Sequence, residues 1–195
     1  MSKKMFSVKK LVMSGLLLAL AFLLPFLTGQ IPQVGSMLLP MHLPVLICGF
    51  VCGWPYGLAV GFIAPLLRSA IMHMPPMYPT AVAMAFELAA YGAACGLLYK
   101  LLPKKGWLVY VELVAAMIFG RLVWGLVTWG LMSIAGNEFT WQIFIASAVL
   151  NAVPGIVLQL VIVPPIVLLL KKASGLLCQV PGRMAGDLVS ACRKS

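Results

Sequence analysis

The chain has 195 residues, of which 63% are hydrophobic and 9% are charged, and its formal net charge is +10. Because an average soluble domain is about 45–50% apolar and about 25% charged, the composition excludes an ordinary soluble domain and indicates an integral membrane protein. Its long apolar runs favour membrane helices over the short alternating strands of a barrel, and they leave no room for a separate soluble domain.

The first predicted span covers residues 11–28. The lysines before it are also typical of a secretory signal peptide, but the apolar run is longer than such a signal normally has, and other spans follow it. Gly15 and Ala19, four residues apart, form a small-residue pair that permits close approach of another helix. That helix belongs either to this chain or to another subunit. The linker 29–39 carries no charge, so we expect it to lie over the protein or in the membrane interface, and it could act as a lid.

The next two predicted spans, 41–53 and 56–74, form a hairpin that folds at Gly53-Trp54-Pro55. The first of them gives roughly 20 Å of helix, short of the ~30 Å hydrocarbon core, so it needs support from its neighbours or lies partly in the interface. Glycines recur every four residues across the turn and allow two backbones to pack closely. Arg68 lies deep in the second arm, and because burial of arginine in a bilayer costs at least about 2.5–3.5 kcal/mol, it should face protein or water.

The remaining predicted spans are 79–102, 107–135 and 141–170. Each contains one polar residue of interest, namely Glu87, Arg121 and Asn151. The membrane domain then covers residues 1–172, and residues 173–195 form a basic tail.

The orientation follows from the cations. Twelve of the fourteen Lys and Arg residues lie in the tails or at helix ends, and six spans place all twelve on one side together with both termini. This is the positive-inside pattern, so we predict an all-α bundle of six transmembrane helices in the plasma membrane with cytoplasmic N- and C-termini. The placement argues for a lipid bilayer as the partner of this charge and against nucleic acid.

In this topology the buried polar residues lie in the outer half or the middle of the membrane. Among Arg68, Glu87 and Arg121 the positive charges outnumber the negative one, and an anionic ligand would remove the imbalance. Planar guanidinium groups suit carboxylates, and Trp124 could supply an apolar wall. The cluster therefore predicts a substrate site that opens outward, to which Asn151 contributes.

Simpler roles remain open for the same residues. Glu87 could be a counter-ion for one arginine while the other extends towards the membrane surface. Asn151 could bridge two helices. His42, predicted near the outer surface, either lines the mouth of the site or is merely solvated.

No catalytic or metal-binding motif is present in the sequence. There is no HExxH, no GxSxG in a suitable context, no serine–histidine–acid arrangement and no phosphate-binding loop. Cys48 and Cys52 share a helix face but have no histidine or acid nearby, which favours packing over metal binding. We therefore predict no enzyme, no cofactor and no metal, and if the chain transports a substrate, another protein must supply the energy.

The hairpin from Leu43 to Ser69, LPVLICGFVCGWPYGLAVGFIAPLLRS, resembles that of the substrate-binding S components of energy-coupling factor (ECF) vitamin transporters. Six spans, a small-residue first helix and the chain length add to the resemblance. It implies a subunit that captures a vitamin from outside, associates with a transmembrane coupling subunit and two ATPase subunits, and topples to release its substrate inside. The family's docking motif is matched by Gly15 and Ala19, with the usual first alanine replaced.

The resemblance does not assign the ligand. The two arginines favour a carboxylate such as pantothenate, nicotinate or a folate, and pantothenate is our choice within that set. The alternative is a stand-alone secondary carrier or membrane enzyme that acts on a small carboxylate. A carrier would normally show an internal repeat, and residues 1–97 and 98–195 show no convincing one.

Overall fold

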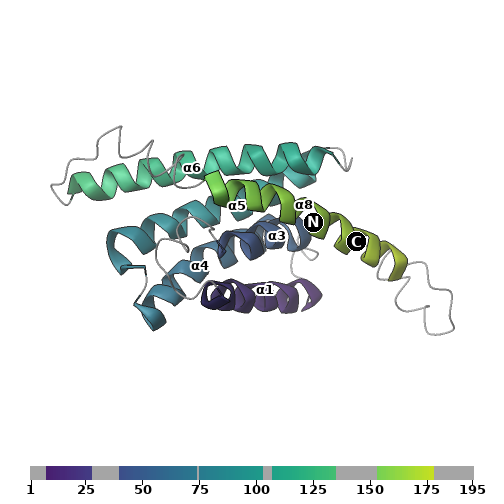
Figure 1. Ribbon diagram of the computed structural model, residues 1–195, viewed down its shortest axis with the longest axis horizontal. Coiled ribbons are helices and arrows are strands. Elements are labelled where there is room, and N and C mark those ends of the chain that lie inside the picture. Colours follow the sequence, from purple (N-terminus) through teal and green to yellow (C-terminus); the bar gives the residue numbers. More distant parts are fainter. Residues whose placement is uncertain (1–7, 28–39, 74, 103–106, 135–152, 178–195) are drawn as a thin grey trace, which may run out of the picture.

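The computed structural model describes residues 8–27, 40–73, 75–102, 107–134 and 153–177. These residues form α1 (Val8–Leu27), α3 (His42–Cys52), α4 (Trp54–Met72), α5 (Val82–Leu101), α6 (Leu108–Ile134) and α8 (Val153–Leu177), with a π-helical turn, η1 (Met77–Ala81), before α5 (Figure 1). No strand occurs among them. The predicted all-α membrane fold is therefore confirmed.

Four of the described helical stretches are long and apolar enough to cross a membrane: Val8–Pro25, Trp54–Met72, Met77–Leu101 and Leu108–Ile134. Two shorter apolar stretches, His42–Cys52 and Pro154–Leu170, complete the set. The helix α8 continues to Leu177, beyond the predicted end of the last span at residue 170 and across the predicted start of the tail. The division into a membrane domain and a tail stays a prediction.

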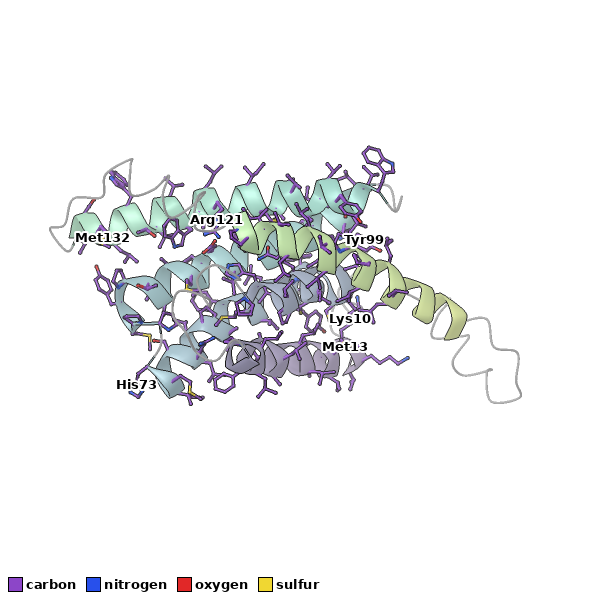
Figure 2. The ribbon with its side chains drawn as sticks, viewed as in Figure 1. Lys10, Met13, His73, Tyr99, Arg121 and Met132 are labelled. Carbon is purple, nitrogen blue, oxygen red and sulfur yellow. The ribbon has the colours of Figure 1, made fainter. Side chains whose placement is uncertain are left out.

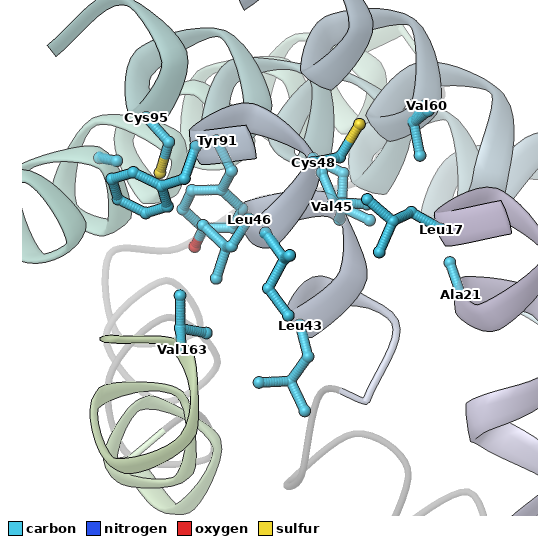
Figure 3. Close-up of a cluster of buried hydrophobic side chains, with 14 of the residues drawn as sticks. Leu17, Ala21, Leu43, Val45, Leu46, Cys48, Val60, Tyr91, Cys95 and Val163 are labelled. Carbon is cyan, nitrogen blue, oxygen red and sulfur yellow. The ribbon is translucent and has the colours of Figure 1, made fainter. Parts of the chain in front are cut away.

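The short helix α3 lies in the centre of the bundle. It contacts α1, α4, α5 and α8, and ten of its eleven residues are buried. Figure 3 shows its apolar side chains between those of α1 and Val163 of α8. Its neighbours thus cover nearly all of its apolar surface, which explains how a helix too short to cross the hydrocarbon core by itself is stabilised there.

Glycines bring three helices into backbone contact. A Cβ atom added to Gly92 of α5 would meet the backbone carbonyl of Gly57 on α4, and one added to Gly49 of α3 would lie 2.6 Å from the carbonyl oxygen of Gly92. The turn between α3 and α4 also needs a glycine, because Gly53 has a φ of 98°. The predicted close packing of backbones is present, and it includes α5 as well as the hairpin.

The bundle has two distinct ends (Figure 2). Lys10 and Tyr99 lie at one end, His73 and Met132 lie at the other, and Arg121 lies between them. We call these the Lys10 end and the His73 end. In the predicted orientation the Lys10 end faces the cytoplasm.

Candidate functional site

A buried carboxylate on α5 joins three helices. Glu87 is 2% exposed, and its Oε1 atom lies 3.0 Å from Nη1 of Arg121 on α6. The hydroxyl of Tyr91, one turn further along α5, donates a hydrogen bond of 3.0 Å to the same oxygen. Nε2 of His42, the first residue of α3, lies 3.8 Å from it. We call His42, Glu87, Tyr91 and Arg121 the Glu87 cluster.

The helices place these side chains for local reasons. Residues four apart share a helix face, so Tyr91 points to the same side of α5 as Glu87. A Cβ atom at Gly120 would meet the ring of Tyr91, so the missing side chain at this position of α6 admits the ring beside Arg121. The ring of His42 meets that of Tyr91 edge-on, with centroids 5.4 Å apart. The cluster is therefore packed as well as hydrogen-bonded.

Several polar atoms of the Glu87 cluster are buried and yet have no hydrogen-bond partner among the described residues. They are Nε of Arg121 and both ring nitrogens of His42. A guanidinium group has five N–H donors in a planar fork, and Glu87 engages its Nη1 atom. The Nε and Nη2 groups of an arginine form a second edge, which has the geometry that binds a carboxylate.

The structure brings together three of the six residues predicted to bind substrate. Glu87, Arg121 and His42 meet in the Glu87 cluster. Of the two roles left open for His42, the solvated one is wrong: His42 is 1% exposed, because α3 lies in the centre of the bundle. Trp124 lies one turn after Arg121 on α6 and is partly buried. The sixth residue, Asn151, lies outside the described residues.

Arg68 lies on α4 and is partly buried. The ion pair of Glu87 is made with Arg121, and His42 lies 3.8 Å from the same oxygen. The two small residues predicted for docking, Gly15 and Ala19, are exposed on α1. A Cβ atom at Gly15 would have nothing within 4 Å of it among the described residues.

Sequence reasoning missed Glu112. This residue lies on α6 and is 2% exposed, nine residues and about 13 Å along the helix before Arg121. With Glu112 counted, the two arginines Arg68 and Arg121 are matched in number by two buried glutamates, so the predicted excess of positive charge disappears. The signal was available, since Glu112 interrupts the same apolar run as Arg121.

Gln159 and Gly120 were not predicted as functional either. Gln159 of α8 is 1% exposed, and its amide nitrogen has no hydrogen-bond partner within the part of the chain that the structure describes. Gly120 admits the ring of Tyr91. A single glycine in an apolar helix gives no sign of which ring it will accommodate.

Comparison with protein families gives a match over most of the chain. The family described as "ECF transporter, substrate-specific component" matches residues 9–167, whereas comparisons with curated proteins and with solved structures gave no match. Members of this family are multi-pass proteins of the plasma membrane that capture a small-molecule substrate and work with coupling and ATPase subunits; it is a family of transporter components, not of enzymes. The resemblance seen in the hairpin is thereby confirmed, and the chain belongs to the family of ECF transporter substrate-specific components.

Proposed function

We propose that this subunit binds a small vitamin that carries a carboxylate, with pantothenate as the first candidate, and that the Glu87 cluster is its binding site. The observation that carries the proposal is the state of Arg121. Its side chain is 15% exposed and paired with Glu87 through Nη1, while its Nε atom is buried and has no hydrogen-bond partner among the described residues. A ligand carboxylate that reaches this edge would not have to break the existing ion pair.

The geometry of Arg121, rather than an excess of charge, supports a carboxylate. Glu112 balances the count of buried charges, so an anion is not required for neutrality. However, an arginine edge offers two parallel N–H groups that fit the two oxygens of a carboxylate. Nε2 of His42, 3.8 Å from Oε1 of Glu87, is a further hydrogen-bonding group without a partner among the described residues. Trp124, Arg68 and Asn151 remain proposed contributors to the walls of the site.

The partners follow from the family and from α1. We propose that one coupling subunit and two ATPase subunits drive delivery to the cytoplasm, and that the coupling subunit docks on the face of α1 that contains Gly15 and Ala19. The other face of α1 packs against the bundle through the buried residues Ser14, Leu17 and Ala21. The two small residues are exposed instead, which leaves them accessible to another helix.

Substitution of Arg121 tests the binding site. The purified chain should retain a carboxylate vitamin that mass spectrometry can identify, and titration should give its Kd. Arg121→Ala should weaken binding at least about tenfold, because hydrogen bonds to charged groups contribute about 1.5–3 kcal/mol. Arg121→Lys keeps the charge but lacks the planar fork, so its Kd should lie between those of the wild type and of Arg121→Ala.

The control is Lys100→Ala, which removes an exposed cation at the end of α5 and should leave the Kd unchanged. Failure of pantothenate, nicotinate and folate to bind in a thermal-shift panel would refute the proposed substrate class. Uptake that depends on a proton gradient and persists without the ATPase subunits would favour the secondary carrier instead.

A further inference from the structure

We infer that Tyr91 is a positioning residue that determines the selectivity of the site for carboxylates, because it holds Glu87 away from the edge of Arg121 that the substrate uses. The inference rests on the proposed function. Glu87 is itself a carboxylate next to Arg121, and it is therefore the protein's own competitor for the Nε and Nη2 donors. Something must keep it on Nη1 if that edge is to remain available.

The hydrogen bond of Tyr91 meets this requirement. Its hydroxyl donates to Oε1 of Glu87 over 3.0 Å, the same oxygen that Nη1 of Arg121 contacts over 3.0 Å. Two donors that converge on one carboxylate oxygen fix the rotation of the carboxylate about its last bond. Without the hydroxyl, Glu87 is free to turn and form the parallel two-bond arrangement that arginine and carboxylate favour, here with Nη1 and Nη2, which takes Nη2 from the edge that the substrate uses.

The position of the Tyr91 ring is fixed by its surroundings. Tyr91 is 2% exposed, its ring packs against the backbone at Gly120, and His42 meets the ring edge-on. Gly120 directly precedes Arg121 in α6. Gly120, against which the ring packs, and Arg121 are thus neighbours in the chain. The position of the Tyr91 hydroxyl relative to the guanidinium of Arg121 is therefore fixed.

The selectivity of the site for carboxylates should therefore depend on the hydroxyl oxygen of Tyr91. In Tyr91→Phe the ring remains and the donor is lost, so Glu87 competes with the ligand for the Nε edge of Arg121. A carboxylate ligand must then displace Glu87. An uncharged analogue makes weaker use of that edge and should lose less affinity.

The experiment measures a ratio of affinities with the full-length protein in detergent or nanodiscs. The probes are pantothenate with its alcohol pantothenol, and nicotinate with nicotinamide. Tyr91→Phe should reduce the preference for the carboxylate member of the pair by roughly tenfold, the scale of one hydrogen bond to a charged group. The matched control is Tyr99→Phe, the same change on the same helix about 12 Å away, which should leave the preference unchanged.

A second variant, Gly120→Ala, should move the Tyr91 hydroxyl without removing it. In Gly120→Ala the added methyl group displaces the ring, so the preference should fall as it does in Tyr91→Phe. Because both changes act through one hydrogen bond, Tyr91→Phe added to Gly120→Ala should have no further effect on the ratio.

The outcomes separate the inference from the proposed function. Equal loss of affinity for both members of a pair would indicate a merely structural role for Tyr91 and would overturn the inference, as would an unchanged ratio in Tyr91→Phe. If Tyr91→Phe does not fold, an unchanged ratio in Gly120→Ala overturns it in the same way. Wild-type protein with no preference for either carboxylate would overturn the proposed function, and the inference with it.

Discussion

Glu87 shows how one buried carboxylate can organise a membrane bundle. Its Oε1 atom accepts a hydrogen bond from the Tyr91 hydroxyl and forms an ion pair with the Arg121 guanidinium, and His42 lies 3.8 Å away. A single oxygen therefore connects α3, α5 and α6. A buried ion pair of this kind adds little net stability compared with an apolar pair, but loss of one partner leaves an uncompensated charge. The residues of the Glu87 cluster should therefore tolerate joint replacement better than single replacement.

The first prediction concerns this ion pair. Glu87→Gln keeps the size of the side chain but leaves the charge of Arg121 uncompensated, and it should lower the free energy of unfolding by about 3–5 kcal/mol. The double variant Glu87→Gln with Arg121→Met removes both charges and should recover part of that loss. Denaturant unfolding of the detergent-solubilised protein measures both. A double variant less stable than either single variant would contradict the pairing.

The candidate site could be predicted in part from the sequence. Glu87 and Arg121 stand out in the sequence because a charged residue in an apolar run is costly unless it faces protein or water. Their contact with each other depends on how α5 and α6 align, which single-chain patterns do not encode. The start of a short span leaves open whether His42 is solvated, and the bundle closes around α3 and buries it.

At the scale of helices, glycine spacing determines which elements touch. Gly57 and Gly61 of α4 lie against α5 so closely that added Cβ atoms would meet its backbone at Gly92 and Leu88. The four-residue spacing was visible in the sequence and predicted close backbones. It did not identify α5 as the third helix, because the spacing alone does not show which helix another glycine pair, such as Gly92 and Gly96, packs against.

The second prediction follows from this contact. Gly92→Ala places a methyl group against the carbonyl of Gly57, and neither backbone can move without separating α4 from α5. Overpacking of this kind typically costs about 1–3 kcal/mol, occasionally more, so the thermal unfolding temperature should fall. The control is Gly130→Ala on α6, where a Cβ atom has nothing within 4 Å among the described residues. That variant should unfold at or slightly above the wild-type temperature, since alanine favours helix. Equal temperatures for the two variants would show that the contact is not tight.

The start of α5 depends on a contact between helices that no sequence pattern reveals. The span predicted from residue 79 begins instead with the turn η1, and α5 proper starts at Val82. Tyr78 in this turn donates a hydrogen bond of 2.7 Å to the backbone oxygen of Leu131, 53 residues away on α6. Such a contact belongs to the assembled bundle, so local propensity could not predict it.

At the scale of the whole molecule, the lysines at the starts and ends of helices lie apart from the Glu87 cluster. Lys9 and Lys10 at the start of α1 and Lys100 at the end of α5 belong to the Lys10 end, whereas Arg121 lies between the two ends (Figure 2). The positive-inside rule would place the Lys10 end in the cytoplasm. A substrate would then approach from the His73 end, and only movement relative to the membrane or rearrangement of helices could expose the site to the cytoplasm. This requirement agrees with a subunit that depends on others for energy.

The last prediction tests where those other subunits attach. Gly15→Leu and Ala19→Leu fill the exposed small-residue face of α1 without touching the core, since both positions are exposed and a Cβ atom at Gly15 meets nothing within 4 Å among the described residues. We expect the Kd for the vitamin to stay unchanged, while uptake in cells that also express the coupling and ATPase subunits is lost, because a bulky residue keeps two helices apart. Gly130→Leu, where an added Cβ atom likewise has no neighbour within 4 Å among the described residues, should change neither quantity. Full uptake by both α1 variants would refute the docking face, and loss of vitamin binding by them would show that α1 contributes to the site itself.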